Sequence, residues 1–342
     1  MCQSKQQGGR RCANRLSGMS NYPSVVKLDN KSDEIIVVSS LDDNPALALH
    51  LAAIAARTGK PLSDEAKEAA QAVSGAYSAL PKKAVWEHWD YILRAPQPGA
   101  GLQAIYDMGW ENNFPELAGI RGVPQDPIWH PEGSVEIHTQ QAADIAARNA
   151  ARDNLSDDET RVAVMGTICH DLGKANATII DGDKISSPEH PETGAPLAKS
   201  FLERIGAPLN VQREVPLIVK NHMCHAGGAT PRAVRRLMNR LDNEGEGTTV
   251  EAWARVAEAD VGGRGEAGTY GVSKPWLELK EKIIAKAKAP RLIVNGDVLI
   301  QHGVEDKLAY REIISKAREA QESGEITDSI SGDKWLKVNG YI

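Results

Sequence analysis

The sequence Thr167-Ile168-Cys169-His170-Asp171-Leu172-Gly173-Lys174 places a histidine and an aspartate side by side, where an apolar run meets a glycine. Neighbouring side chains within a helix point about 100° apart and do not share a partner, so such a pair needs a helix end. Gly173 is the residue type that ends helices, and the apolar residues before it predict a buried helix. We therefore expect His170 and Asp171 at the mouth of a core helix.

The carboxylate of Asp171 needs compensation at such a position. A carboxylate in a protein core requires a cation, several hydrogen-bond donors or open solvent. Taken alone, the stretch favours a capping or hydrogen-bonded pair over two metal ligands. Ser156 and Glu159 have the spacing of a capping box and predict the start of the same helix. Residues elsewhere must decide between the two interpretations.

A second predicted helix carries an aspartate on its apolar stripe. Thr248 and Glu251 again have the spacing of a capping box, and the stripe set by Trp253 and Val256 continues to Asp260. No Lys or Arg lies one turn before this aspartate. Both a metal ligand and a buried hydrogen-bond acceptor fit the position.

A third helix is predicted to begin at His138, with Ala142 and Ala146 on the same face. A lone inward histidine is more often a satisfied core residue than a ligand. The combination changes this balance, because four groups of ligand type face inward on three predicted helices. They are His138, His170, Asp171 and Asp260, and they predict one shared metal site.

Further histidines are concentrated in this region, since six of the nine lie between His130 and His225. They include His190 and His222. A solvated loop position is the default for any one of them, but this density is typical of metal binding or proton transfer. Cys169 and Cys224 lie beside histidines, yet without Cys-x-x-Cys spacing a zinc-thiolate site is only weakly indicated. We expect Cys169 to be a small buried apolar residue.

The order His138, His170-Asp171 and Asp260 resembles the HD superfamily of metal-dependent phosphohydrolases. The similarity extends to the HD and C-terminal part of bacterial CCA-adding tRNA nucleotidyltransferases, over roughly residues 102–335. The segments that carry it are Val123-Pro124-Gln125, Trp129–Gly133, His138-Thr139, His170–Lys174, Glu189-His190, Asn221-His222 with His225, Arg235–Leu241, Glu258–Asp260 with Gly263-Arg264, Asn295–Leu299 and Gly324–Ile326. The Gly-rich turn and paired aspartates of that family's nucleotidyltransferase head have no counterpart before Trp86. Nucleotide addition is therefore not expected.

The resemblance implies an enzyme that removes phosphate from nucleotides and opens 2',3'-cyclic phosphates with a divalent metal ion. It implies metal-ligand roles for His138, His170, Asp171 and Asp260, and catalytic roles for Lys174, His190, His222 and Arg264. Lys174 and Arg264 would neutralise phosphate oxygens, or they are solvated helix-end charges. His190 and His222 would hold a second metal or transfer protons. The nitrogen and oxygen ligands admit Mn, Ni, Co, Mg, Fe or Zn.

Two glutamates near these histidines, Glu132 and Glu192, are expected to orient His130 and His190 as hydrogen-bond acceptors rather than to act in catalysis.

Composition bounds the fold. The 342 residues are 41% hydrophobic and 5% aromatic, which gives room for two or three helical subdomains. Ala-rich segments with few β-branched runs predict an all-α protein, an HD-domain bundle between a neck and a tail. We predict a polar, largely disordered leader (1–40), a helical neck (41–122) packed by Trp86 and Trp89, an HD phosphohydrolase domain (123–265) and a C-terminal helical tail (266–342). Val215–Val219 and Ile35–Val38 are the only plausible strands, and the first also fits a buried helix.

The net charge and the lack of membrane-spanning runs limit the partners that we expect. A formal net charge of −6 argues against a globally basic nucleic-acid coat. Four arginines at helical spacing predict a solvated face, with a contact to substrate or RNA phosphate as the alternative; they are Arg232, Arg235, Arg236 and Arg240. No apolar run spans a bilayer and the four cysteines show no disulfide framework, so we expect a cytoplasmic protein. The expected partners are a nucleotide or RNA-end phosphate, tRNA, and a second copy in a homo-oligomer, with no membrane.

Three functions fit the sequence. The first is a phosphohydrolase acting on nucleotide or RNA-end phosphates, with 2',3'-cyclic phosphodiesterase and 2'-nucleotidase or phosphatase activity. The second is a dNTP/NTP nucleotidase or triphosphohydrolase, which would use the same metal. The third is a non-catalytic tRNA-binding, RNA-binding or partner-binding module, against which the intact ligand set argues.

Overall fold

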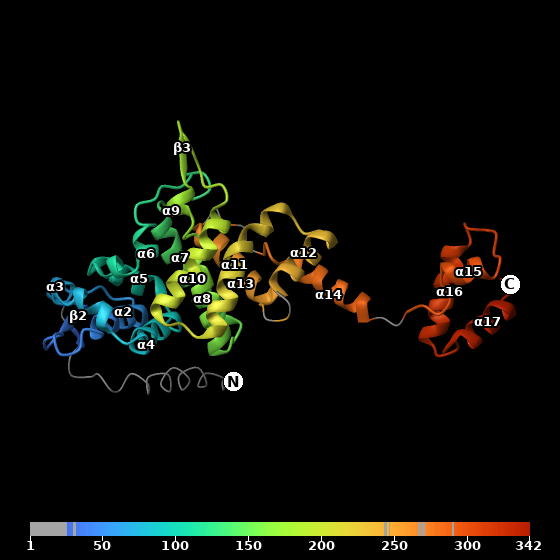
Figure 1. Ribbon diagram of the computed structural model, residues 1–342, viewed down its shortest axis with the longest axis horizontal. Coiled ribbons are helices and arrows are strands. Elements are labelled where there is room, and N and C mark those ends of the chain that lie inside the picture. Colours follow the sequence, from blue (N-terminus) through green and yellow to red (C-terminus); the bar gives the residue numbers. More distant parts are fainter. Residues whose placement is uncertain are drawn as a thin grey trace, which may run out of the picture. The chain divides into compact units, whose positions relative to one another are not determined.

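The computed structural model describes residues 26–29, 32–242, 245, 247–265, 268, 271–288 and 291–342. The chain divides into two compact units, Met1–Glu281 and Lys282–Ile342. Helices dominate both, and the sheets of the described residues are two antiparallel pairs of strands (Figure 1). The prediction of an all-α protein is confirmed. No helix in the described parts of the chain is long and apolar enough to cross a membrane.

The first unit begins with a hairpin. Strand β1 (Val26–Asp29) pairs with β2 (Glu34–Val37), so the strand predicted at Ile35–Val38 exists and lies in the segment assigned to the leader. Residues 1–25, predicted to be disordered, lie outside the described residues. Short helices follow: α2 (Leu47–Thr58), α3 (Asp64–Ala72), η2 (Ser74–Ala79), α4 (Lys82–Leu93), α5 (Pro98–Asp107), η3 (Trp110–Asn113) and α6 (Pro115–Ala118).

Longer helices form the rest of this unit and pack side by side (Figure 1). They are α7 (Val135–Arg152), α8 (Asp157–Cys169), α10 (His190–Ile205), α11 (Leu209–Asn221), α12 (Pro231–Asp242) and α13 (Val250–Gly263), with the short elements α9 (Lys174–Ala177) and η4 (His222–Gly227) between them. A second hairpin, β3 (Ile179–Asp181) and β4 (Lys184–Ser186), projects between α9 and α10. Val215–Val219, for which the sequence left a strand and a buried helix open, lie in α11, where Val215 and Val219 are buried on one helical face.

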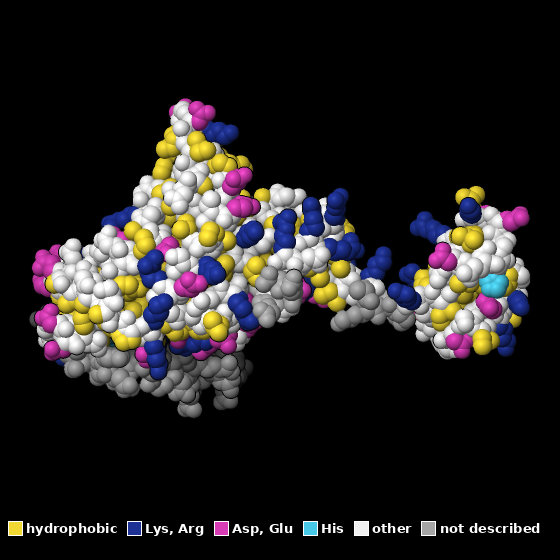
Figure 2. All heavy atoms as spheres, viewed as in Figure 1, with side chains coloured by type: hydrophobic (Ala, Val, Ile, Leu, Met, Phe, Trp, Pro, Cys, Tyr) yellow, Lys and Arg dark blue, Asp and Glu magenta, His cyan; other side chains and the backbone are white. Residues whose placement is uncertain are grey.

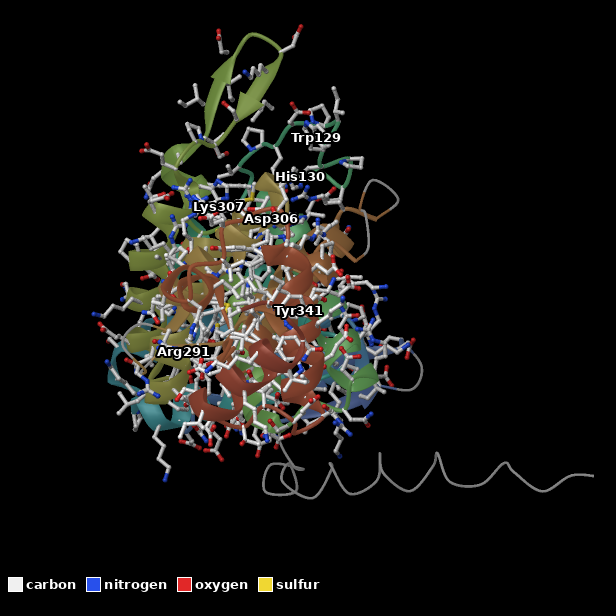
Figure 3. The ribbon with its side chains drawn as sticks, turned by 90° about the vertical axis from the view of Figure 1, so that its right-hand side faces the viewer. Trp129, His130, Arg291, Asp306, Lys307 and Tyr341 are labelled. Carbon is white, nitrogen blue, oxygen red and sulfur yellow. The ribbon has the colours of Figure 1, made fainter. Side chains whose placement is uncertain are left out.

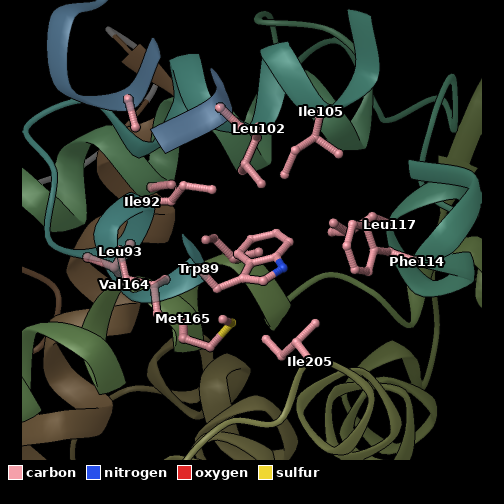
Figure 4. Packing of buried hydrophobic residues seen from close by; sticks show 14 of the residues in the cluster. Trp89, Ile92, Leu93, Leu102, Ile105, Phe114, Leu117, Val164, Met165 and Ile205 are labelled. Atoms are coloured by element: carbon pink, nitrogen blue, oxygen red, sulfur yellow. The ribbon is translucent and has the colours of Figure 1, made fainter. Parts of the chain in front are cut away.

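One apolar core joins the predicted neck to the helices that follow it. Trp89 of α4 is fully buried, and its ring centroid lies 5.5 Å from that of Phe114 and 5.3 Å from that of Phe201 in α10. Figure 4 shows Trp89 among the surrounding labelled side chains. Trp86 is half-buried against the same cluster, so both tryptophans pack the neck as predicted. Burying such rings stabilises the fold by about 2 kcal/mol or more each.

The turn after α8 differs from its prediction. Ser156 and Glu159 form the expected capping box, but the last helical residue is Cys169, and His170 is the C-cap. Gly173 has a φ of −66° and is not in the left-handed conformation of a helix-ending glycine. Its importance is space, since a Cβ there would lie 2.0 Å from the carbonyl oxygen of His190. Gly173 therefore permits the start of α10 to pack against the His170-Asp171 turn.

The N-cap of α13 is also displaced from its prediction. The side chain of Thr249, rather than that of Thr248, accepts a hydrogen bond from the backbone of Ala252. The Thr248 hydroxyl instead donates to Glu214 of α11 at 2.7 Å. Thr248 thus links two helices, which a local spacing rule does not detect.

The second unit has its own small core. Helix α14 (Lys274–Lys288) crosses the division between the units, and α15 (Gly296–Gln301), α16 (Tyr310–Glu322) and α17 (Ser329–Val338) follow it. The core residues are Val294, Leu299, Ile313, Ala317, Ala320, Ile326, Trp335 and Leu336.

Candidate metal centre

The four predicted metal ligands come from three helices that pack together. His138 lies in the first turn of α7, Asp260 near the end of α13, and His170 and Asp171 directly follow α8. The two histidines are 0% exposed and the two aspartates 2% exposed. Helix α7 contacts both α8 and α13, which brings the four side chains to one point in the core.

The ligand atoms converge at short distances. The Nε2 atom of His138 lies 3.3 Å from Nε2 of His170 and 3.3 Å from Oδ1 of Asp260. The Nε2 atom of His170 lies 3.1 Å from Oδ2 of Asp171. Ligand atoms that share an ion at 2.0–2.2 Å lie about 3 Å apart. We call His138, His170, Asp260 and Oδ2 of Asp171 the His138 cluster.

A second group of ligand atoms adjoins the first. Oδ1 of Asp171 lies 3.3 Å from Nε2 of His190 and 3.8 Å from Nε2 of His222, and the two imidazole nitrogens are 3.1 Å apart. These three residues form the His190 cluster. The two carboxylate oxygens of Asp171 thus face two different clusters.

The backbone is strained just before α10. Glu189 has a φ of +57°, a conformation that costs a non-glycine residue about 1 kcal/mol or more.

The histidines are held so that Nε2 is available as a ligand. In each of three rings, Nδ1 contacts the backbone carbonyl oxygen three residues earlier. The carbonyls belong to Thr167 for His170, Ser187 for His190 and Val219 for His222, at 2.6, 2.7 and 2.6 Å. Because a carbonyl only accepts hydrogen bonds, it fixes the proton on Nδ1 and leaves the Nε2 lone pair for a cation.

His138 is oriented by a carboxylate instead. Oε1 of Glu132 lies 2.6 Å from Nδ1 of His138 and 2.9 Å from Nδ1 of His130. Glu132 therefore orients His130 as predicted and also a residue of the His138 cluster, which the sequence did not indicate. Glu192 is exposed, and the Nδ1 atom of His190 contacts the Ser187 carbonyl, so the expected Glu192–His190 pair is wrong.

Two cations neutralise the buried aspartates. Nζ of Lys174 lies 2.7 Å from Oδ2 of Asp171, and Nη2 of Arg264 donates to Oδ1 of Asp260 at 3.0 Å. Burial would raise the pKa of both carboxyls, but His170 and Lys174 hold the pKa of Asp171 well below its ordinary value. For Asp260, the hydrogen bond to His138, the neighbouring imidazole of His170 and the Arg264 guanidinium have the same effect on the pKa. Both aspartates are therefore ionised.

The imidazoles respond differently to burial. Burial, together with the neighbouring imidazole of His170, lowers the pKa of His222 to about 3. Burial would also lower the pKa of His138, but its contacts with Asp260 and Glu132 outweigh that effect and raise it. His222 is therefore neutral at pH 7, the form that binds metal.

The donor set fits a divalent cation. Oδ2 of Asp171 is buried and accepts no hydrogen bond of good geometry, although Lys174 lies beside it. A buried carboxylate requires positive charge, which Lys174 supplies from one side and a cation among the Nε2 atoms would supply from the other. Imidazole nitrogens and carboxylate oxygens suit Mn, Fe, Co, Ni, Zn or Mg. The buried His and Asp groups could hold such an ion.

Of the cysteines in the described residues, neither Cys169 nor Cys224 joins these clusters. The thiol of Cys169 contacts Sδ of Met165 at 3.7 Å, and burial raises its pKa, so it packs as a small apolar residue as predicted. Burial also raises the pKa of Cys224, which lies near Arg240. The missed contributors are Gln125, which accepts a hydrogen bond from Lys174, and Glu132 as a partner of His138. Both lie on a loop, where no periodicity marks their direction.

The fold and site define a mainly helical protein with a buried histidine–aspartate cluster that could bind metal. Comparison with known proteins places the chain near one group of enzymes. It is 29% identical to the multifunctional CCA protein of Pasteurella multocida (strain Pm70) over 289 residues, 80% of this chain and 66% of that protein. It is 30% identical to the multifunctional CCA protein of Vibrio vulnificus (strain YJ016) over 209 residues, 58% of this chain and 49% of that protein.

A third relative, the multifunctional CCA protein of Acinetobacter baumannii (strain AYE), is 28% identical over 79% of this chain and 66% of its own length. The chain thus spans between about half and two thirds of the length of these relatives. No protein-family model matches it. These similarities relate the chain to the multifunctional CCA proteins.

Proposed function

We propose that the protein is an HD-type metal-dependent phosphohydrolase acting on nucleotide or RNA-end phosphates, with 2',3'-cyclic phosphodiesterase and 2'-nucleotidase or phosphatase activity. The observation that carries the proposal is the convergence of His138, His170, Asp171 and Asp260, which is the ligand order of the HD resemblance. The similarity to multifunctional CCA proteins supports the same assignment.

Asp171 favours two cation positions over one. Its Oδ2 atom faces the His138 cluster and its Oδ1 atom faces the His190 cluster. Such a carboxylate would serve two cation positions, one held by the His138 cluster and one by the His190 cluster. The neutral His222, with its pKa lowered to about 3, fits a ligand better than a proton donor at pH 7. We therefore assign His190 and His222 to a second metal position.

The protein's own residues would prepare a phosphate for hydrolysis. A divalent ion, when bound, lowers the pKa of a coordinated water and withdraws charge from phosphorus. Arg264 is held by Asp260, while its buried Nε atom has no hydrogen-bond partner among the described residues and is available for an anion. Nζ of Lys174 lies 2.7 Å from Asp171, where it would offset negative charge that develops on a bound phosphate.

An RNA end is supported by the surface of α12. Four arginines of this helix, Arg232, Arg235, Arg236 and Arg240, are exposed, as predicted for a solvated face. Figure 2 shows dark-blue side chains gathered over the region where Figure 1 places α12. Helix α12 packs against α11, whose end leads into His222. We propose that this face contacts the backbone of an RNA, with tRNA the class that the CCA relatives suggest.

The test is turnover by metal-stripped protein resupplied singly with Mg²⁺, Mn²⁺, Co²⁺, Ni²⁺ or Zn²⁺. The substrates are 2',3'-cyclic AMP, 2'-AMP, 3'-AMP and dNTPs, with Asp171→Ala alongside. Metal-dependent hydrolysis that is lost in the variant is the expected result. Turnover that survives Asp171→Ala would contradict the mechanism, and preferred hydrolysis of dNTPs would favour the nucleotidase or triphosphohydrolase instead.

A further inference from the structure

We propose that Trp129 stacks on the base of a nucleotide whose phosphate binds at the metal centre, so that the site selects nucleoside phosphates over phosphates without a base. The inference rests on the proposed function, because it takes the metal centre as the phosphate site. Trp129 lies on the segment Gln125–Gly133 between α6 and α7, which we call the Trp129 loop.

Both ends of the Trp129 loop are bonded to residues of the metal centre. At one end, Gln125 accepts a hydrogen bond at 2.7 Å from Lys174, whose Nζ atom lies 2.7 Å from Asp171. At the other end, Glu132 holds Nδ1 of His138 at 2.6 Å. Lys174 is thus the one side chain between Gln125 and Asp171, and Glu132 contacts His138 directly. The Gln125 amide closes the base of the loop by donating to the Gly133 carbonyl at 3.2 Å.

The tip of the loop is a tight turn organised by Asp126. Its backbone carbonyl accepts from the amides of Trp129 and His130 at 3.2 and 2.8 Å, and its side chain accepts from the amide of Ile128 at 2.9 Å. The chain rises at most about 3.5 Å per residue, so Trp129 lies within roughly 10 Å of the Glu132 anchor. The turn thus holds Ile128 and Trp129 beside the metal centre.

Two neighbouring rings of the loop differ in burial. His130 is 9% exposed and packs edge-on against His138, with ring centroids 4.8 Å apart. Trp129 is 64% exposed and Ile128 is 77% exposed. Figure 3 shows Trp129 farther from the helices than His130. The other six tryptophans of the chain are buried or half-buried, so the exposed indole is an exception in this protein.

An exposed indole beside a phosphate site matches the chemistry of a nucleotide. Its face stacks on any base, and such stacking changes affinity roughly tenfold per base. In a nucleoside phosphate the sugar separates the base from the phosphate, so a stacking residue must lie near the metal centre but outside it. Trp129 satisfies this condition, because it is near the metal centre through its loop but is not one of the ligands.

The test measures binding without turnover. AMP and ribose 5-phosphate are titrated by calorimetry into the full chain loaded with Mn²⁺, for the wild type, Trp129→Ala and Trp129→Phe. We expect AMP to bind roughly tenfold more weakly to Trp129→Ala and close to normally to Trp129→Phe, because phenylalanine also stacks. Ribose 5-phosphate should bind all three proteins equally.

Leu209→Ala is the matched control, because Leu209 is 76% exposed and begins α11. The 13-residue helix separates it by about 20 Å from His222, which follows the other end. AMP affinity should not change in this variant. A change equal to that of Trp129→Ala would show a general effect of removing exposed apolar side chains and would overturn the proposal.

Other results would also overturn it. These are unchanged AMP affinity in Trp129→Ala, an equal loss of ribose 5-phosphate affinity, and no AMP binding by the wild type. Base-selective binding without hydrolysis of any phosphate ester would support the stacking role while contradicting the phosphohydrolase. Hydrolysis of 2',3'-cyclic AMP with the same KM in wild type and Trp129→Ala would support the phosphohydrolase while contradicting the stacking role.

Discussion

Two groups of buried histidines lie in the same compact unit and differ in what surrounds them. His50 of α2 and His88 of α4 are each 3% exposed, with ring centroids 5.5 Å apart. Burial lowers the pKa of His50, and burial together with the charge of His50 lowers that of His88 to about 4. In the metal centre, Asp260 and Glu132 outweigh burial and raise the pKa of His138.

The comparison separates burial from coordination. Both groups are removed from water, so burial alone does not make a histidine a ligand. In the metal centre, ionised carboxylates and fixed Nδ1 contacts direct the Nε2 atoms of His170 and His190 toward the two clusters. We therefore expect changes in the metal centre to affect metal and turnover, and changes at His50 or His88 to affect stability only.

The largest effect is expected at Asp171, whose two carboxylate oxygens face the two clusters. Asp171→Ala should abolish stoichiometric metal binding and reduce hydrolysis of 2',3'-cyclic AMP by roughly a thousandfold or more, because both clusters lose a ligand. Bound metal is measured by elemental analysis and the fold by circular dichroism. Asp144→Ala is the control, since this half-buried aspartate on α7 accepts from the Gly99 amide instead. Equal metal loss in both variants would contradict the assignment.

Gly173→Ala should be the next most damaging change. The added Cβ would meet the His190 carbonyl at 2.0 Å and would displace the start of α10. We expect a loss of roughly 1–3 kcal/mol in the free energy of unfolding, measured with denaturant, and weaker metal binding. Gly75→Ala is the matched control because nothing lies within 4 Å of its added Cβ. Similar stabilities for the two variants would show that the close approach is not needed.

The role of Glu132 is tested by a smaller change. Glu132→Gln should weaken metal binding by about 10–100-fold, because an amide holds the His138 proton less strongly than a carboxylate. Glu192→Gln alters a similar side chain beside His190 that is exposed, and it should leave affinity unchanged. Metal titrations by calorimetry distinguish them. The orienting role is contradicted if both variants bind like the wild type.

The neck histidines give the smallest prediction, a pH dependence of stability. The folded-state pKa of His88 is about 4, below its ordinary value of 6.5, so the unfolded chain binds more protons between these pH values. Stability is therefore fully present above pH 6.5 and is lost as pH falls toward 4. The unfolding free energy of the wild type should fall between pH 7 and pH 4.5. In His88→Leu this fall should be smaller by on the order of 2 kcal/mol. Equal differences would refute this.

The sequence predicted the helical class because apolar spacing and caps are local. The box formed by Ser156 and Glu159 depends on residues three apart, and it exists as predicted. The sequence left Val215–Val219 open between a strand and a buried helix, because Val215 and Val219 are β-branched. They lie in α11, where packing against α10 outweighs a weak intrinsic preference. The strands β3 and β4, exposed along most of their length, gave no periodic signal.

The sequence by itself determined which residue types face inward, since His138, His170, Asp171 and Asp260 lie on or beside apolar helical faces. Only the tertiary structure decided that one carboxylate adjoins two clusters, that Glu132 holds His138 and that Gly173 admits α10. The reason is physical. Helical periodicity fixes the direction of a side chain within one element, whereas these contacts join loops and helices distant in sequence, and only packing brings them together.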